Sequence, residues 1–179
     1  MSGAKDSLDR IEAAINKAKN GEHLWWETFK KVFDGIPIDY SEDTYEEFGS
    51  KWFDCEMERW TDNQLIISGD SAWSPVSAFF LKLSKYFNVT IESDYEESGC
   101  DFGGWFECKN GEVLRDEHTT WLMYCDINDP GRAFEVIIDN IKDGVYETYD
   151  EWFEEEDNAL IARLTTEQIK KIQDEFKRQ

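Results

Sequence analysis

The sequence has few of the residues that mark a catalytic protein. It contains only two histidines, His23 and His118, and neither stands near a serine or cysteine in a pattern typical of an activated nucleophile. It also lacks a G-x-S-x-G sequence, a phosphate-binding P-loop and the glycine pattern of dinucleotide-binding proteins. We therefore expect a protein that is not an enzyme and that uses no cofactor.

Cysteine is scarce, and its four positions contain no C-x-x-C pair. Cys100, Cys108, His118 and Cys125 together contain enough ligand atoms for zinc, but their spacings match no ordinary zinc pattern. We expect no metal site, and reduced thiols of the kind found in the cytoplasm. The sequence also has no apolar signal region at its start and no run of the roughly 18 apolar residues that a membrane span needs.

Basic residues are outnumbered by acidic ones, 19 against 40, which gives a formal net charge of −21. Direct binding of DNA, RNA or an anionic membrane is therefore not expected, because these partners attract lysine and arginine. Aromatic residues are abundant, with 8 Trp, 12 Phe and 7 Tyr. Since disordered acidic chains are poor in aromatic residues, we expect a folded chain, and its length suits one domain over residues 1–179.

Periodicity predicts the order of the elements. Apolar residues at helical spacing predict helices over residues 7–20 and 24–35, after Pro130 as far as Gly144, and from Thr166 onwards. Alternation predicts strands over 52–60, 64–68, 89–96, 102–108 and 119–126. Ser74-Pro75 is typical of an N-cap followed by a first helical residue. The predicted fold class is α+β, with helices grouped around an antiparallel sheet.

Three short motifs occur in order along the middle of the chain. They are Gly49-Ser50-Lys51-Trp52, Ser71-Ala72-Trp73-Ser74-Pro75, and the run from Tyr95 to Gly104. Together they resemble the YubB-type ferredoxin-like domain of phage and plasmid proteins, over roughly residues 47–113. The resemblance implies a ferredoxin-like core without an iron–sulfur cluster.

The domain is expected to comprise a helical N-terminal extension (1–46), the ferredoxin-like core (47–126) and an acidic helical C-terminal region (127–179). Within the core, we interpret Trp52 and Trp73 as buried core residues, and Gly99 and Gly104 as turns. The family supplies no activity, and it does not account for the two extensions.

The acidic residues are concentrated in three segments. Residues 39–58 contain eight acids and one base, residues 92–107 contain six acids and no base, and residues 143–157 contain eight acids and no base. Two of these segments include strands, in which acids are normally depleted. Carboxylates two residues apart on a strand lie about 6.6 Å apart, a spacing of the same order as that of nucleic-acid phosphates.

The leading hypothesis is therefore a nucleic-acid mimic of a phage or mobile element, which inhibits a basic, nucleic-acid-binding defence protein in the cytoplasm of the host cell. Such a partner would be a CRISPR effector or a restriction enzyme. Trp105, Tyr146, Tyr149 and Phe153 are possible aromatic anchors beside the acids. The candidate contact residues are Asp54, Glu56, Glu58, Glu92, Asp94, Glu96, Asp143, Glu147, Asp150, Glu151, Glu154, Glu155, Glu156, Asp157 and Trp152.

Three alternatives remain open at this point. The carboxylates could belong to a metal-dependent hydrolase or nuclease, since Mg²⁺ needs only one or two of them. The chain could be an accessory phage protein with a structural role. The acidity could also serve only solubility or adaptation to salt.

Overall fold

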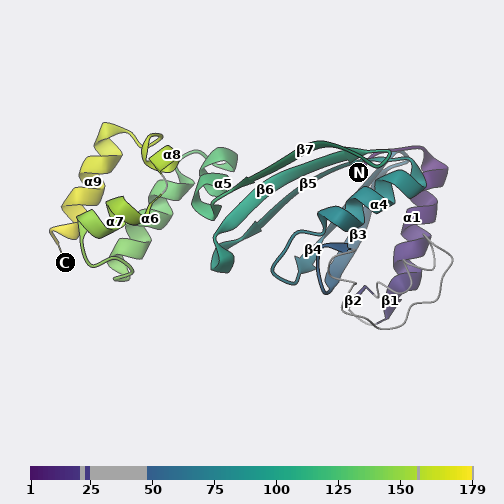
Figure 1. Ribbon diagram of the computed structural model, residues 1–179, viewed down its shortest axis with the longest axis horizontal. Coiled ribbons are helices and arrows are strands. Elements are labelled where there is room, and N and C mark those ends of the chain that lie inside the picture. The colour runs from purple at the N-terminus through teal and green to yellow at the C-terminus, as the bar shows by residue number, and fades with distance from the viewer. Residues whose placement is uncertain (21–22, 25–47, 157, 179) are drawn as a thin grey trace. The chain divides into compact units, whose positions relative to one another are not determined.

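The computed structural model describes residues 1–20, 23–24, 48–156 and 158–178 (Figure 1). The described chain forms two compact units. The first comprises Met1–Tyr95 and Trp105–Glu117, and the second comprises Glu96–Gly104 and His118–Gln179. The predicted helix over 24–35 lies outside the described residues except for Leu24, which is in a strand. Cooperative folding of the two units as a single domain over 1–179 stays a prediction.

The first unit contains two layers, helices on one side and strands on the other. Its elements are α1 (Lys5–Ala18), β1 (Lys19–Asn20), β2 (His23–Leu24), β3 (Phe53–Thr61), β4 (Gln64–Ser71), α4 (Ser77–Phe87) and most of β5 (Thr90–Glu97), β6 (Phe102–Lys109) and β7 (Glu112–Thr119). The strands form one sheet in the order β1-β2-β3-β4 and another in the order β5-β6-β7. Ser2 bridges Gln64 of β4 and Thr90 of β5 and so lies between the two sheets.

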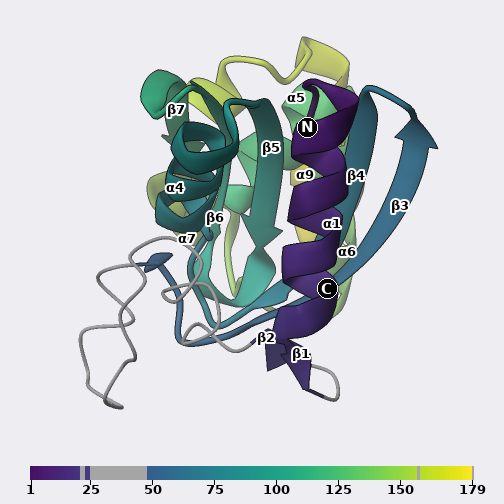
Figure 2. The same ribbon diagram turned by 90° about the vertical axis from the view of Figure 1, so that its right-hand side faces the viewer.

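Helices α1 and α4 cover the same face of these strands (Figure 2). Helix α1 buries Leu8, Ile11 and Ile15, which are spaced as a helix requires for one apolar stripe. Helix α4 buries Phe79 and Leu83 against the same core. Strands β3, β5 and β6 contribute alternate residues such as Cys55, Ile91 and Phe106, as the period of two predicted.

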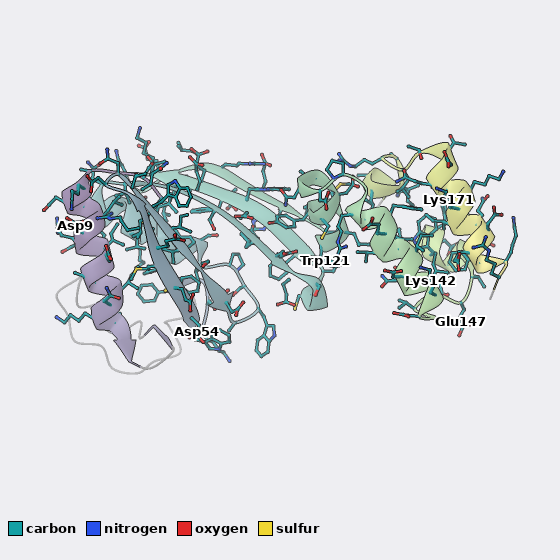
Figure 3. The ribbon with its side chains drawn as sticks, turned by 180° about the vertical axis from the view of Figure 1, so that it is seen from behind. Asp9, Asp54, Trp121, Lys142, Glu147 and Lys171 are labelled. Carbon is teal, nitrogen blue, oxygen red and sulfur yellow. The ribbon has the colours of Figure 1, made fainter. Side chains whose placement is uncertain are left out.

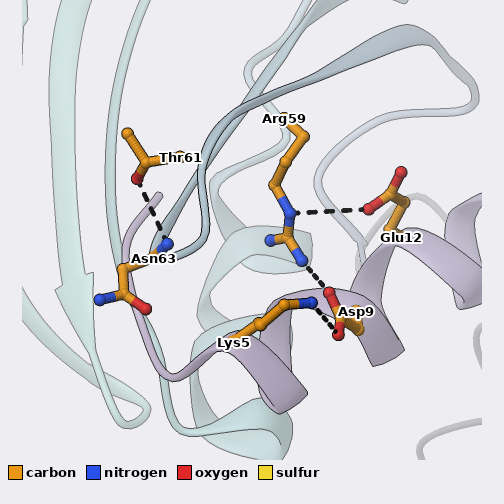
Figure 4. A network of polar contacts seen from close by, with 6 residues as sticks. All are labelled: Lys5, Asp9, Glu12, Arg59, Thr61 and Asn63. Atoms are coloured by element: carbon orange, nitrogen blue, oxygen red, sulfur yellow. Dashed lines mark hydrogen bonds and ion pairs between the residues drawn. The ribbon is translucent and has the colours of Figure 1, made fainter.

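Arg59 of β3 joins the sheet to α1 on this inner face. Its guanidinium forms ion pairs with Asp9 and Glu12 (Figure 4), and Asp9 also pairs with Lys5 at 2.8 Å. The bond to Lys5 holds the pKa of the Asp9 carboxyl below its usual value, and the charge of Arg59 adds to this effect. Beyond Arg59, the turn is closed by a hydrogen bond from the Asn63 amide to the Thr61 hydroxyl.

The second unit is mainly helical. It contains the 3₁₀ turn η1 (Ser98–Cys100) and the helices α5 (Trp121–Asn128), α6 (Arg132–Lys142), α7 (Tyr149–Glu155), α8 (Asn158–Ile161) and α9 (Thr166–Phe176). Its core includes Ile137, Ile141, Trp152 and Ile172. Helices α7 and α9 each begin with a capping box, at Thr148 and Thr165, which satisfies amides that have no partner within the helix.

The α+β class and its helical extensions are confirmed, but one predicted strand is wrong. Residues 119–126 form the end of β7 and then helix α5, not a strand. The Thr120 hydroxyl accepts a hydrogen bond from the Met123 amide, and this N-cap starts the helix. The returning strand of the hairpin at Asn110-Gly111 is β7.

The roles assigned to the motif residues also need correction. Trp52 and Trp73 are 38% and 72% exposed, so neither is a core residue, because both stand at the end of the β3–β4 ladder. Gly104 is buried within β6 and makes no turn. Helix α4 begins at Ser77 after an N-cap position at Val76, so Ser74 does not cap it.

Serine hydroxyls instead tie two of the motifs together. Ser74 donates to the Gly49 carbonyl at 2.5 Å, and the Ala72 amide donates to the hydroxyl of the fully buried Ser50 at 2.9 Å. The Ser50 hydroxyl in turn donates to the Trp52 carbonyl at 3.0 Å. The segment from Gly49 to Trp52 and the segment from Ser71 to Pro75 therefore form one hydrogen-bonded unit.

Candidate partner-binding surfaces

Strand β3 presents its carboxylates to one face, as the alternation predicted. Phe53 and Cys55 point into the core, whereas Glu56 and Glu58 are exposed and Asp54 is half-buried. Across the ladder, Asp54 pairs with Asp70, Glu56 with Ser68 and Glu58 with Ile66. We call Asp54, Glu56 and Glu58 the β3 ladder; Figure 3 labels Asp54. The like-charged Asp54–Asp70 pair is destabilising in a sheet.

The candidate carboxylates on β5, Glu92, Asp94 and Glu96, do not extend the β3 ladder. Glu92 and Asp94 are exposed, but β5 belongs to the other sheet, and β4 and Ser2 stand between it and β3. The third member, Glu96, accepts a hydrogen bond from the Trp121 indole nitrogen at 2.7 Å within the second unit. The carboxylates of β3 and β5 therefore do not stand side by side in one sheet.

The third acidic segment surrounds α7 in the second unit. Asp143, Glu147, Asp150, Glu154 and Glu155 are exposed, and none of them forms an ion pair with another described residue; we call these five the α7 cluster (Figure 3 labels Glu147). Nearby bases are already paired with other acids. Lys142 binds Asp139, Lys171 binds Glu167, Lys177 binds Asp174 and Arg178 binds Glu175.

Part of the α7 cluster has an unfavourable position for local stability. Glu154 and Glu155 lie in the last turn of α7, which contains no basic residue. The C-terminal end of a helix has partial negative charge, so carboxylates there are destabilising. These residues also stand four positions after Asp150 and Glu151, and like charges at that spacing repel one another. The charges of Glu154 and Glu155 therefore do not stabilise helix α7.

Other predicted contact residues serve the fold. Glu151 accepts backbone hydrogen bonds in the capping box of α7, and Glu156 accepts a hydrogen bond from the Tyr146 hydroxyl at 2.8 Å. Burial, with the bond to Glu156, raises the pKa of Tyr146 above its ordinary value. Asp157 lies outside the described residues.

Trp152 is a correction, because it is fully buried in the core of the second unit. It packs against Tyr149, with 5.5 Å between the ring centroids, and so cannot anchor a partner. Trp105 is also engaged, since the Arg115 guanidinium lies 4.9 Å from its ring centroid. Of the aromatic anchors predicted, Phe153 is the exposed one, at 45%.

The residues considered for zinc do not come together. Cys108 is buried in the core of the first unit, whereas Cys100 and Cys125 belong to the second. Burial and the neighbouring Glu96 carboxylate raise the pKa of the Cys125 thiol. Within the described part of the chain, no three His, Cys, Asp or Glu side chains are grouped so as to hold a metal ion. Nor does any described helix have the length and apolar character of a membrane span.

The sequence interpretation missed two exposed apolar side chains beside the β3 ladder. Trp60 is 65% exposed and Ile66 is 45% exposed. The signal was present, because Trp60 continues the alternation of Asp54, Glu56 and Glu58 on the outer face.

The segment that contains strands β3 to β7 with α4 and α5 is similar to a known domain family. Residues 51–129 match the family described as the ferredoxin-like domain in Api92-like protein. The match covers less than half of the chain, so this region is similar to that family. The chain is also similar to the protein named Uncharacterized protein YubB from Escherichia coli (strain K12), with 32% identity over 87 residues. No solved structure matches the chain.

The match to YubB covers 46% of this chain and 59% of the relative, so the chain spans less than two thirds of the relative's length. The YubB-type resemblance is thereby confirmed for the middle of the sequence. The region matched to the Api92-like family contains the β3 ladder and Ser74, whereas Gly49 and Ser50 stand directly before its first residue. Helices α6 to α9, and with them the α7 cluster, lie beyond its last matched residue.

Proposed function

We propose that this protein binds a basic, nucleic-acid-binding partner through the α7 cluster, as a nucleic-acid mimic. The observation that carries the proposal is a set of exposed carboxylates without counter-ions, kept where two of them destabilise their own helix. Selection for solubility alone would not favour acids at a helix C-terminus, because acids at other exposed positions avoid the unfavourable interaction with the helix dipole. The partner is a defence protein of a host cell, such as a CRISPR effector or a restriction enzyme.

Charge and apolar contact have separate roles in this proposal. The second unit contains 18 acidic and 7 basic residues, and the attraction of this charge speeds association with a basic cleft. Charge alone gives little affinity once salt screens it, so an apolar anchor is needed. Phe153, on α7 between Trp152 and Glu154, is that anchor. No catalytic step is assigned to the protein.

Capture of the partner from a host lysate, with a salt titration from about 50 to 500 mM, tests the proposal. We expect capture of a nucleic-acid-binding protein that falls with salt and that added DNA or RNA displaces. The double variant Glu154→Gln, Glu155→Gln should weaken capture. The control Glu135→Gln, Glu167→Gln changes the net charge equally, but at carboxylates already paired with Arg132 and Lys171.

The proposal fails if both double variants reduce capture equally, because the effect would then come from net charge and not from the α7 cluster. It also fails if the captured protein is indifferent to salt and to competing nucleic acid. A stoichiometric Mg²⁺ or Mn²⁺ site seen by calorimetry would favour a metal-dependent hydrolase instead.

A further inference from the structure

Trp60 stands at a β-bulge of strand β3 and faces away from the core of the first unit. Strands β3 and β4 pair regularly as far as Arg59 and Leu65, but the next pair is Thr61 with Gln64. Trp60 is therefore an extra residue with no partner across the ladder. Such a bulge bends the strand and redirects a side chain, and bulges are frequent beside functional sites.

The neighbouring Arg59 explains the direction that Trp60 takes. Arg59 points to the inner face, where Asp9 and Glu12 of α1 hold its guanidinium (Figure 4). Trp60 follows it in the chain and faces outward, 65% exposed. An indole that is so exposed contributes little to folding, although its burial against a partner would contribute much.

Trp60 borders a groove in the surface of the first unit. The groove has a volume of about 350 Å³, and its lining includes Trp60, Leu65, Ile66, Thr90 and Glu92. Ile66 is 45% exposed and stands opposite Glu58 across the β3–β4 ladder. Two large apolar side chains therefore lie at the end of the β3 ladder, beside a hollow that can receive a side chain.

One positive charge, the α-ammonium of Met1, belongs to the groove lining, where it donates a hydrogen bond to the Leu65 carbonyl at 2.8 Å and is attracted by Glu92. The adjoining outer face of β3 and β4 is acidic. On this outer face, Glu56, Glu58 and Asp70 form no ion pair with any other residue that the structure describes. A phosphate chain would be repelled here, whereas a cationic side chain would be attracted. An arginine suits the surface best, since a guanidinium both stacks on an indole ring and binds carboxylates through paired hydrogen bonds.

We propose that the outer face of β3 and β4 binds an extended, arginine-containing segment of a partner protein, with Trp60 as the stacking platform. Alternate side chains of an extended segment lie about 6.6 Å apart, which is also the spacing of Glu56 and Glu58 along β3. Successive arginines in an Arg-x-Arg pattern therefore each meet one carboxylate, and the next one reaches Trp60. Ile66 and the groove take the apolar part of the segment.

This inference rests on the proposed function in one respect, that the partner is cationic. It concerns another surface, in the first unit, and can be tested without the partner. The probe is a dye-labelled peptide in which three arginines alternate with serines, titrated with the intact protein by fluorescence anisotropy. Trp60→Ala should raise the Kd five- to tenfold, which corresponds to the loss of one cation–π contact with its burial.

Trp73→Ala is the matched control, because Trp73 is also an exposed tryptophan of the first unit, at 72%. It should leave the Kd unchanged. Glu56→Gln with Glu58→Gln should weaken binding and flatten its salt dependence, and a peptide with lysine in place of arginine should bind more weakly. Circular dichroism of each variant excludes unfolding as the cause.

Three outcomes overturn the inference: no binding of the arginine peptide by the intact protein, equal effects of the Trp60 and Trp73 substitutions, or loss of binding in Glu154→Gln, Glu155→Gln alone. The two proposals fail separately. If Trp60→Ala keeps full peptide affinity while lysate capture depends on the α7 cluster, only the β3–β4 surface is wrong. If the peptide binds through Trp60 but no nucleic-acid-binding protein is captured, only the proposed function is wrong.

Discussion

Neutralising Glu154 and Glu155 should make the protein more stable while it weakens partner binding. Each carboxylate in the last turn of a helix costs about 0.3–1 kcal/mol through the helix dipole. The pairs Asp150–Glu154 and Glu151–Glu155 each add roughly 0.2–0.5 kcal/mol of repulsion. Glutamine has nearly the same shape and helix propensity as glutamate, so Glu154→Gln, Glu155→Gln removes the charges and little else. We expect a gain of about 1 kcal/mol or more at low salt.

Urea unfolding followed by circular dichroism measures this gain, in about 20 mM salt and again in 1 M salt, where the screening length is only about 3 Å. The gain should shrink in 1 M salt. Glu167→Gln is the control, and its change in the free energy of unfolding should have the opposite sign. Glu167 lies in the first turn of α9, where the helix dipole favours a carboxylate, and it pairs with Lys171. The substitution should destabilise the protein by a few tenths of a kcal/mol.

The reasoning is refuted if the double variant is less stable than the parent at low salt, or if its gain is the same at both salt concentrations. Either result would mean that Glu154 and Glu155 stabilise α7 through contacts and that their charge has no local cost. The inference that these acids are kept for a partner would then lose its basis.

Three further predictions test the fold. Trp152→Ala should destabilise the second unit by about 3–5 kcal/mol in urea unfolding, because it empties the largest fully buried side-chain site. Arg59→Met should cost roughly 1–2 kcal/mol by removing the ion pairs that join β3 to α1, whereas Lys5→Met, at an exposed helical pair, should cost under about 0.5 kcal/mol. Iodoacetamide should modify the exposed Cys100 first, as seen by mass spectrometry; Cys125 should need a higher pH than a free thiol, because burial and Glu96 raise its pKa and keep it protonated as the pH rises.

Regular alternation and helical spacing predicted most of the first unit correctly. The faces of β3 were predicted correctly, with Phe53 and Cys55 inside and Glu56 and Glu58 outside. In a strand with one buried face, apolar and polar residues alternate, and this alternation identifies the buried side. The strand predicted over 119–126 was wrong because the apolar run from Trp121 to Cys125 has no clear period, and such runs suit a strand or a buried helix equally well. Only the N-cap at Thr120 distinguished the two.

Tryptophan was the residue type for which sequence reasoning failed most clearly. Trp52 and Trp73 were expected inside and are exposed, whereas Trp152 was expected outside and is buried. Hydrophobicity alone does not decide the side on which an indole lies, because that depends on which face of its element meets the core. For Trp152 a signal existed, since the capping box at Thr148 and Glu151 starts a short helix whose inner face carries Tyr149 and Trp152.

The geometry of the β3 ladder could be predicted, but its neighbours could not. Spacing gave the position of each carboxylate along its strand, yet the separation of β3 from β5 depends on long-range pairing through β4 and Ser2. Likewise, nothing local to Trp60 indicates the bulge between Arg59 and Thr61.

The hydrogen bonds of Ser50 and Ser74 link two motifs that stand more than twenty residues apart in the chain. Each hydroxyl binds the backbone of the other motif, so the two serines together hold the same pair of segments. Among relatives of this chain, the two serines should therefore be inherited as a pair, kept together or replaced together. A homologue that retains only one of them would be expected to close this end of the β3–β4 hairpin in a different way.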